Sequence, residues 1–126
     1  RIDYEHNAST RDFLYVIGSN MLSTDLYNTV KKANESLKIN LDYRYDDPND
    51  PNRFYYRSDH YNFAKHNIPS VFFFNGVHDD YHQPGDTPDK IEYDLLKRRT
   101  QLTFNAAWLL ANAENRPVVD KTSTTN

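Results

Sequence analysis

The chain has 126 residues and a formal net charge of −3, with acidic and basic residues mixed along its length. It lacks the clustered Lys/Arg stripe of nucleic-acid-binding proteins, and no apolar run approaches the roughly 18 residues of a membrane span. The absence of cysteine excludes disulfides and thiolate zinc sites, while ten Tyr and seven Phe supply bulk for a folded core.

Two patterns near the N-terminus indicate a strand followed by a helix. The apolar run at residues 12–18 is typical of a strand buried on both faces. Ser23 or Thr24 can cap the next helix, in which apolar residues recur every three or four positions. A second strand is predicted near residues 38–44.

The middle of the chain contains a loop, a short helix and a third strand. Residues 46–52 are dense in Pro, Asn and Asp and therefore predict a loop. Ser58 or Asp59 begins a short helix that is expected to end near Asn67. Residues 70–74 are rich in Phe and predict the third strand, which a polar loop follows at 77–87.

The last predicted element is a long helix near residues 88–114, with Thr87 as its cap and Pro88 as its first residue. The basic run 97–99 is interpreted as a solvated face of this helix. The helix is expected to turn six residues toward the core: Ile91, Leu95, Leu102, Ala106, Leu109 and Ala113.

The order of these elements, β-α-β-α-β-α, predicts the fold class. It indicates a three-layer α/β fold with a mostly parallel sheet flanked by helices. This domain is expected to occupy residues 1–114, and residues 115–126 are interpreted as a polar tail.

The loop at 77–87 is the candidate functional segment, because functional residues of such sheets gather beyond strand ends. It contains the run His78-Asp-Asp-Tyr-His82, and imidazole and carboxylate are suitable zinc ligands. A polar surface loop with Asp residues as turn formers would have the same composition. Spacing does not decide between the two, because the two histidines are not on a predicted helix.

An ordered set of motifs resembles the closing part of the di-zinc aminopeptidase family (peptidase family M28). This family includes secreted bacterial leucyl-type aminopeptidases and glutamate carboxypeptidase, with glutaminyl cyclases as relatives. The resemblance extends loosely over residues 11–114. Its motifs are Arg57-Ser-Asp-His60, Phe63, Ile68-Pro69, the Phe-rich strand, Gly76, His78-Asp-Asp-Tyr-His82, Asp86-Thr87 and Asp89-Lys90-Ile91.

The resemblance implies roles for individual residues. It implies that His82 is a zinc ligand and that Tyr81 polarises the substrate carbonyl, a suitable use of a phenol donor facing a developing oxyanion. Packing in an aromatic-rich chain is the alternative role for Tyr81. His78 is expected at the rim of the site, and structural or supporting roles are expected for Asp59, His60 and Asp86.

The resemblance also implies that the site in this chain is incomplete. The family holds two zinc ions with several His, Asp and Glu side chains, and a further Glu serves as general base. The chain lacks the family's adjacent Glu pair and its Asp-Met-Ile-Gly strand. The isolated chain is therefore expected to be inactive.

The expected function is a part of a zinc-dependent exopeptidase of the aminopeptidase type, which acts on peptide substrates and is secreted or periplasmic. A non-catalytic relative that binds a peptide or a partner is the alternative. A one-chain metal-binding protein that uses His78, His82 and nearby Asp residues is a third possibility. Self-association through an exposed sheet edge is expected, because an unpaired strand edge is a template for another chain.

Overall fold

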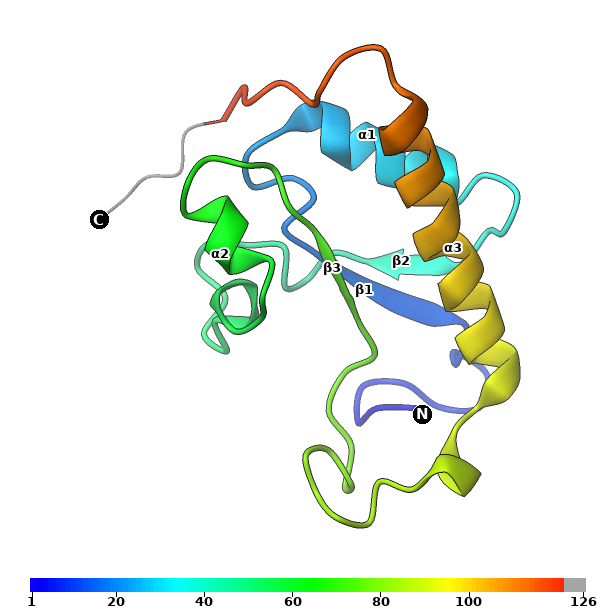
Figure 1. Cartoon of the computed structure of the whole chain (residues 1–126). Helices are drawn as coiled ribbons and strands as arrows, with labels where there is room; N and C mark the ends of the chain where they lie inside the picture. The colour runs from blue at the N-terminus through cyan, green and yellow to red at the C-terminus, as the bar shows by residue number, and fades with distance from the viewer. Residues whose placement is uncertain (122–126) are drawn as a thin grey trace.

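A small mixed sheet with two packed helices forms the centre of the fold (Figure 1). The structure is a computed structural model that describes residues 1–121. The end of the predicted polar tail, residues 122–126, lies outside the described residues. None of the helices within residues 1–121 is both long enough and apolar enough to cross a membrane.

Three strands form the sheet, in the order β2-β1-β3. The central strand β1 (Phe13–Ile17) is buried along its whole length. It pairs in parallel with β2 (Asn40–Asp42) and antiparallel with β3 (Phe72–Phe74). The three predicted strands are confirmed with shorter bounds and the α/β class holds, but the sheet is mixed rather than mostly parallel.

The direction of β3 follows from the short helix that precedes it. Helix α2 (Tyr61–Ala64) has four residues and lies beside the start of β3 (Figure 1). A parallel connection needs a crossover that returns the chain to the opposite end of the sheet, usually a full helix. Instead, the chain enters β3 where β1 ends, so that Ile17 faces Phe72. The helix predicted to run from Ser58 or Asp59 to Asn67 is therefore wrong in its start and its length.

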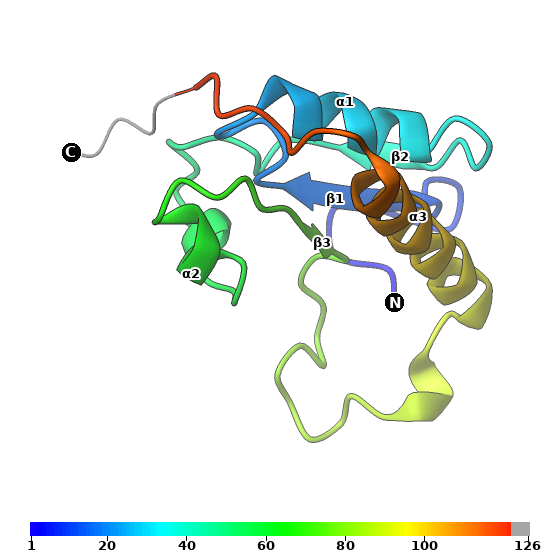
Figure 2. The same cartoon turned by 45° about the horizontal axis from the view of Figure 1, so that its top comes forward.

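Two long helices cover one face of the sheet, and Figure 2 shows them side by side. Helix α1 (Thr24–Ala33) begins after Ser23, whose Oγ accepts a hydrogen bond from the N–H of Leu26 at 3.2 Å. This contact confirms the predicted cap. Helix α3 (Tyr93–Asn112) packs against α1, and the two helices bury apolar side chains with one face of β1: Leu14, Val16, Leu26, Val30, Ala33, Leu102 and Ala106.

Aromatic side chains cover the opposite face of the sheet. Phe13, Tyr15 and Ile17 of β1 pack there against Phe54 and Tyr55 of the short 3-10 helix η1 (Phe54–Tyr56) and against Ala64 of α2. The three-layer fold predicts a layer of helices on this face, but the face is covered by short helical turns and loops instead.

Helix α3 begins later than predicted. Thr87 precedes a 3-10 turn, η2 (Pro88–Lys90), and the backbone at Ile91 is extended before α3 starts. The guanidinium of Arg11 holds this start, because it lies 2.8 Å from the carboxylate of Glu92 and 2.6 Å from that of Asp94. Leu95, Leu102 and Ala106 are buried as predicted, whereas Ile91 and Ala113 are exposed.

The basic run at 97–99 is only partly solvated. Arg99 is 7% exposed, and its Nε donates a hydrogen bond to the backbone oxygen of Phe13 at 3.0 Å. The neighbouring Arg98 pairs with Asp12 at 2.9 Å. The interpretation of this run as a solvated face is therefore wrong for Arg99, whose long side chain passes into the core to reach a strand carbonyl.

The described part of the tail lies along the start of α1. The carboxylate of Asp120 accepts a hydrogen bond from the N–H of Thr24 at 2.9 Å, and the N–H of Val118 donates to Asp25 at 3.0 Å. These contacts anchor the chain between residues 117 and 121.

Candidate functional site

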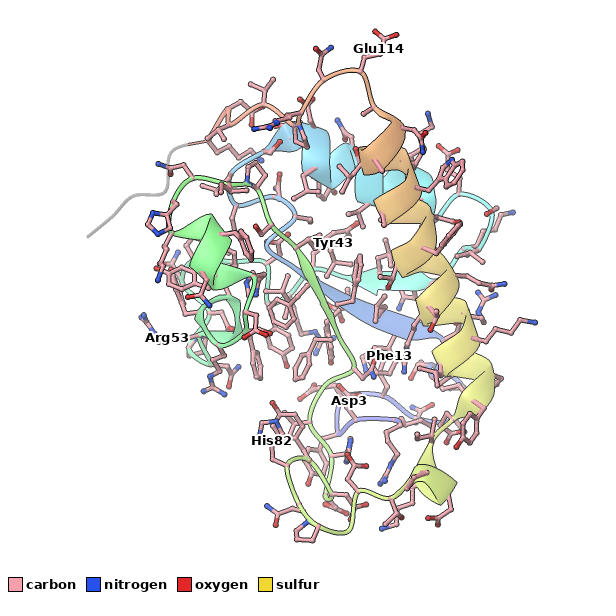
Figure 3. All side chains as sticks on the ribbon, viewed as in Figure 1. Asp3, Phe13, Tyr43, Arg53, His82 and Glu114 are labelled. Carbon is pink, nitrogen blue, oxygen red and sulfur yellow. The ribbon has the colours of Figure 1, made fainter. Side chains whose placement is uncertain are left out.

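Three of the five predicted site residues, Tyr81, His82 and Asp86, lie on the loop that follows β3, at the lower end of the molecule in Figure 3, where His82 and Asp3 are labelled. The loop leaves the sheet through Gly76, which has a φ of +88°. A Cβ atom at this position would overlap the carboxylate of Asp3, so only glycine fits. The N–H of Tyr4 donates to the oxygen of Val77 at 3.1 Å, and the N-terminal segment therefore supports the loop.

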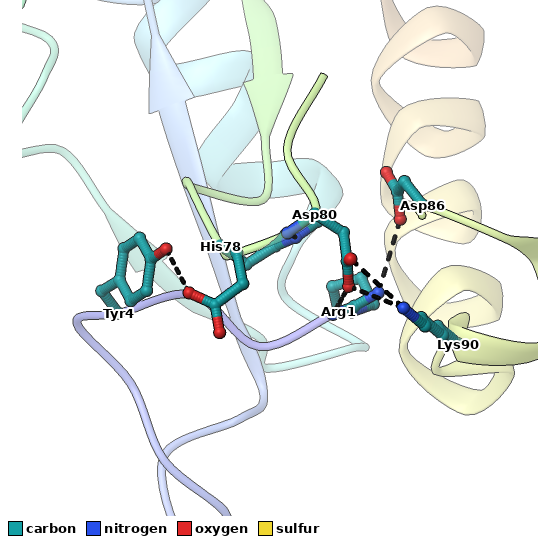
Figure 4. A network of polar contacts seen from close by, with 7 residues as sticks. Arg1, Tyr4, His78, Asp80, Asp86 and Lys90 are labelled. Carbon is teal, nitrogen blue, oxygen red and sulfur yellow. Dashed lines mark hydrogen bonds and ion pairs between the residues drawn. The ribbon is translucent and has the colours of Figure 1, made fainter. Parts of the chain in front are cut away.

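Ion pairs hold the loop at Asp80 and Asp86, as Figure 4 shows. The carboxylate of Asp80 lies 2.7 Å from Arg1 Nη2 and 3.1 Å from Lys90 Nζ. The hydrogen bond from Arg1, followed by that from Lys90, lowers the pKa of Asp80. Arg1 also reaches Asp86 at 3.4 Å, so Asp86 belongs to this ion-pair network.

Two further polar contacts use the side chains that precede Tyr81. The hydroxyl of Tyr4 donates to Asp79 at 2.5 Å, which raises the pKa of Tyr4. The Nδ1 atom of His78 accepts a hydrogen bond from the N–H of Asp80 at 3.2 Å. One ring nitrogen of His78 is thus occupied by the turn itself.

The imidazole of His82 is exposed and makes no hydrogen bond to any residue in the described part of the chain. Its backbone has a φ of +56°, in the left-handed region that costs a residue other than glycine roughly 1 kcal/mol. The ring stacks on that of Tyr81, with centroids 4.0 Å apart. Tyr81 in turn packs edge-on against Phe74, the last residue of β3.

Asp59 and His60 precede α2, and His60 lies at the start of β3, the end away from the loop of His82. The His60 ring packs against Phe72, the first residue of the strand, and against Tyr55. Both of its nitrogens are buried without a partner among residues 1–121, and burial lowers its pKa. Asp59 is exposed. The structure therefore does not bring this pair to the loop of His82.

The loop does not form a complete metal site among the described residues. Within residues 1–121, no three His, Asp or Glu side chains form a group that could hold a metal ion. The nearby carboxylates of Asp79 and Asp80 are engaged by Tyr4, Arg1 and Lys90. The free imidazole of His82 fits the role of a single donor to a metal whose other ligands come from elsewhere.

A buried polar cluster that the sequence does not predict lies beside the loop. Asp3, which is 6% exposed, accepts a hydrogen bond from the hydroxyl of Tyr15 at 2.6 Å and lies 2.7 Å from Nδ1 of His6. Burial, and secondarily the bond to Asp3, raises the pKa of Tyr15. The spacing of Asp3 and His6 is a weak signal, and nothing in the sequence marks Tyr15 as their partner.

These features define an α/β domain with a histidine- and aspartate-rich loop at a strand end. The family model for Peptidase family M28 matches residues 6–107, which is most of the chain, and the chain belongs to this family. A peptidase-type, hydrolytic function follows from this membership. All the predicted site residues lie within the matched region. No curated protein and no solved structure matches the chain.

Proposed function

We propose that this chain supplies His82 as one zinc ligand of an exopeptidase of the aminopeptidase type. One observation carries the proposal: in a chain of this peptidase family, the His82 imidazole is exposed and free of hydrogen bonds on the loop that follows β3.

The surroundings of His82 suit a metal ligand. Stacking on Tyr81 orients the imidazole, and the edge contact of Tyr81 with Phe74 ties both rings to the sheet. The carboxylate of Asp80 is already paired with Arg1 and Lys90, and that of Asp79 accepts a hydrogen bond from Tyr4. His82 is therefore the side chain of the loop that is ready to bind a cation.

Tyr81 is proposed to act on the substrate. Zinc, when bound, serves as a Lewis acid toward the scissile carbonyl and toward water. The hydroxyl of Tyr81 has no hydrogen-bond partner in the described chain, so it is free to donate to the carbonyl oxygen as that oxygen gains negative charge. The remaining ligands and the Glu that accepts a proton are proposed to lie outside these residues, in a secreted or periplasmic enzyme.

Kinetics of a complete catalytic domain that contains this chain would test the role of Tyr81. Tyr81→Phe removes only the hydroxyl and should lower kcat by about 10²–10³, the usual cost of one oxyanion donor, with KM and zinc content little changed. Tyr93→Phe is the matched control, because its exposed hydroxyl already donates to the backbone oxygen of Pro88.

An unchanged kcat in Tyr81→Phe would remove the catalytic role and leave Tyr81 as a packing residue. A complete domain that binds peptides but hydrolyses none of them would establish the alternative, a non-catalytic relative.

A further inference from the structure

The outer face of α3 carries an exposed apolar stripe, which we call the α3 stripe: Tyr93, Leu96, Thr100, Phe104 and Trp108. Spacings of three and four place these residues on one side of the helix, opposite the buried Leu102 and Ala106. Tyr93, Phe104 and Trp108 are 60%, 62% and 60% exposed, and the rings of Phe104 and Trp108 stack on each other. Contiguous apolar patches of this kind mark interaction surfaces in soluble proteins.

We propose that the α3 stripe is the interface of a homodimer in which two copies of α3 pack antiparallel. The stripe is nearly symmetric about Thr100. Leu96 and Phe104 lie about 6 Å from it on either side, and Tyr93 and Trp108 lie about 11 Å away at the outer ends. A two-fold axis at Thr100 would place each Leu96 against Phe104 of the second copy, and each Tyr93 against Trp108 of the second copy.

The exposed area is sufficient for such a dimer. An aromatic side chain offers about 150–250 Å². At the observed exposures, the three aromatic residues and Leu96, which is 46% exposed, present about 400 Å² per copy. Two copies would bury about 800 Å² from these side chains alone, and the surrounding helix surface would bring the total into the range of weak but specific interfaces, near 1,000 Å².

The centre of the stripe also suits close packing. Thr100 is small, so the helices can approach, and Lys97, which lies three residues before it within the stripe, has a side chain long enough to carry its charge out to solvent. Within residues 1–121, no other segment crosses the outer side of α3 in Figures 1 and 2. The edge strands β2 and β3 have only three residues each, so they offer a second copy much less surface than α3 does. The inference is independent of the peptidase proposal.

Sedimentation and fluorescence of the 126-residue chain would test the dimer. Trp108 is the only tryptophan, so its emission reports directly on the stripe. Between about 1 and 500 µM, the mass should rise from monomer to dimer, because interfaces at the low end of the size range are weak and transient. Over the same range the emission should shift to shorter wavelength, because the indole leaves water.

Two substitutions identify the surface. Thr100→Arg places two like charges together at the two-fold axis and should weaken the dimer at least about 100-fold. Asn49→Arg adds the same charge to an exposed position in the loop that leads to η1, which covers the opposite face of the sheet from α3, and should leave the dimer intact. Circular dichroism would verify that both variants are folded, and Phe104→Ala should weaken the dimer without adding charge.

Two results would overturn the inference. One is a chain that stays monomeric with constant Trp108 emission over the whole concentration range. The other is association that persists in Thr100→Arg and Phe104→Ala, because a different surface, such as a sheet edge, would then be responsible.

Discussion

Replacing Asp3 with alanine should destabilise the fold strongly, because this carboxylate satisfies two buried donors. It accepts a hydrogen bond from the Tyr15 hydroxyl at 2.6 Å, and it pairs with His6 at 2.7 Å. The side chains of His6 and Asp3 are only 6% and 2% exposed. The substitution removes both partners at once and leaves the Tyr15 hydroxyl and the His6 ring unpaired in the core.

The size of the effect follows from these two contacts. A hydrogen bond to a charged group contributes about 1.5–3 kcal/mol, so two predict a loss of about 3–6 kcal/mol. A pocket of about 290 Å³ lined by Asp3, Tyr45 and Phe54 can admit water, which would partly replace the lost partner. We therefore expect a loss in the lower half of that range, about 3–4 kcal/mol.

Urea denaturation followed by circular dichroism would measure this loss. With a denaturant slope of about 2 kcal/mol per molar, the midpoint of Asp3→Ala should fall by about 1.5–2 M. Tyr15→Phe, which removes only one of the two contacts, should show an intermediate midpoint. Asp79→Ala, which removes an exposed partner of Tyr4, should keep the original midpoint. Equal midpoints for Asp3→Ala and Asp79→Ala would refute the reasoning.

Two further predictions concern local contacts. Ser23→Ala removes a buried helix cap and should cost about 1 kcal/mol in urea denaturation, whereas the exposed Ser36→Ala should cost nothing measurable. Because burial lowers the pKa of His60, its neutral form is favoured in the folded state, and stability should fall as pH drops below the unfolded value of about 6.5. The free energy of unfolding, measured between pH 7.5 and pH 5, should fall less in His60→Leu than in the unchanged chain. The exposed His66→Gln should behave like the unchanged chain. Identical pH profiles for the unchanged chain and both variants would contradict this role of His60.

The sequence predicts those features of the fold that depend on local signals. β1 is an unbroken apolar run, and the structure buries all of it. Ser23 stands directly before an apolar periodicity, and its Oγ makes the expected cap. The loop containing His82 was identified by an ordered set of motifs, and the family match includes it.

The features that the sequence does not predict depend on contacts between distant segments. The antiparallel direction of β3 follows from the short helix α2, after which the chain enters β3 beside the end of β1. The residues of β3 themselves give no signal of this direction. The late start of α3 depends on Arg11, about 80 residues away along the chain, which pairs with Glu92 and Asp94. Arg99 lies within a basic run, a pattern typical of a solvent-exposed helix face, yet its guanidinium donates a hydrogen bond to the backbone of Phe13.

The zinc content of a complete catalytic domain that contains this chain tests the central claim most directly. Elemental analysis after dialysis would compare His82→Ala with His78→Ala, because both histidines lie on the same loop, but the turn occupies Nδ1 of His78 and neither ring nitrogen of His82. The account predicts that His82→Ala loses bound zinc and nearly all peptide hydrolysis, while His78→Ala keeps its zinc and most of its activity. A His82→Ala domain that retains full zinc and full turnover would contradict the assignment of His82 as a zinc ligand.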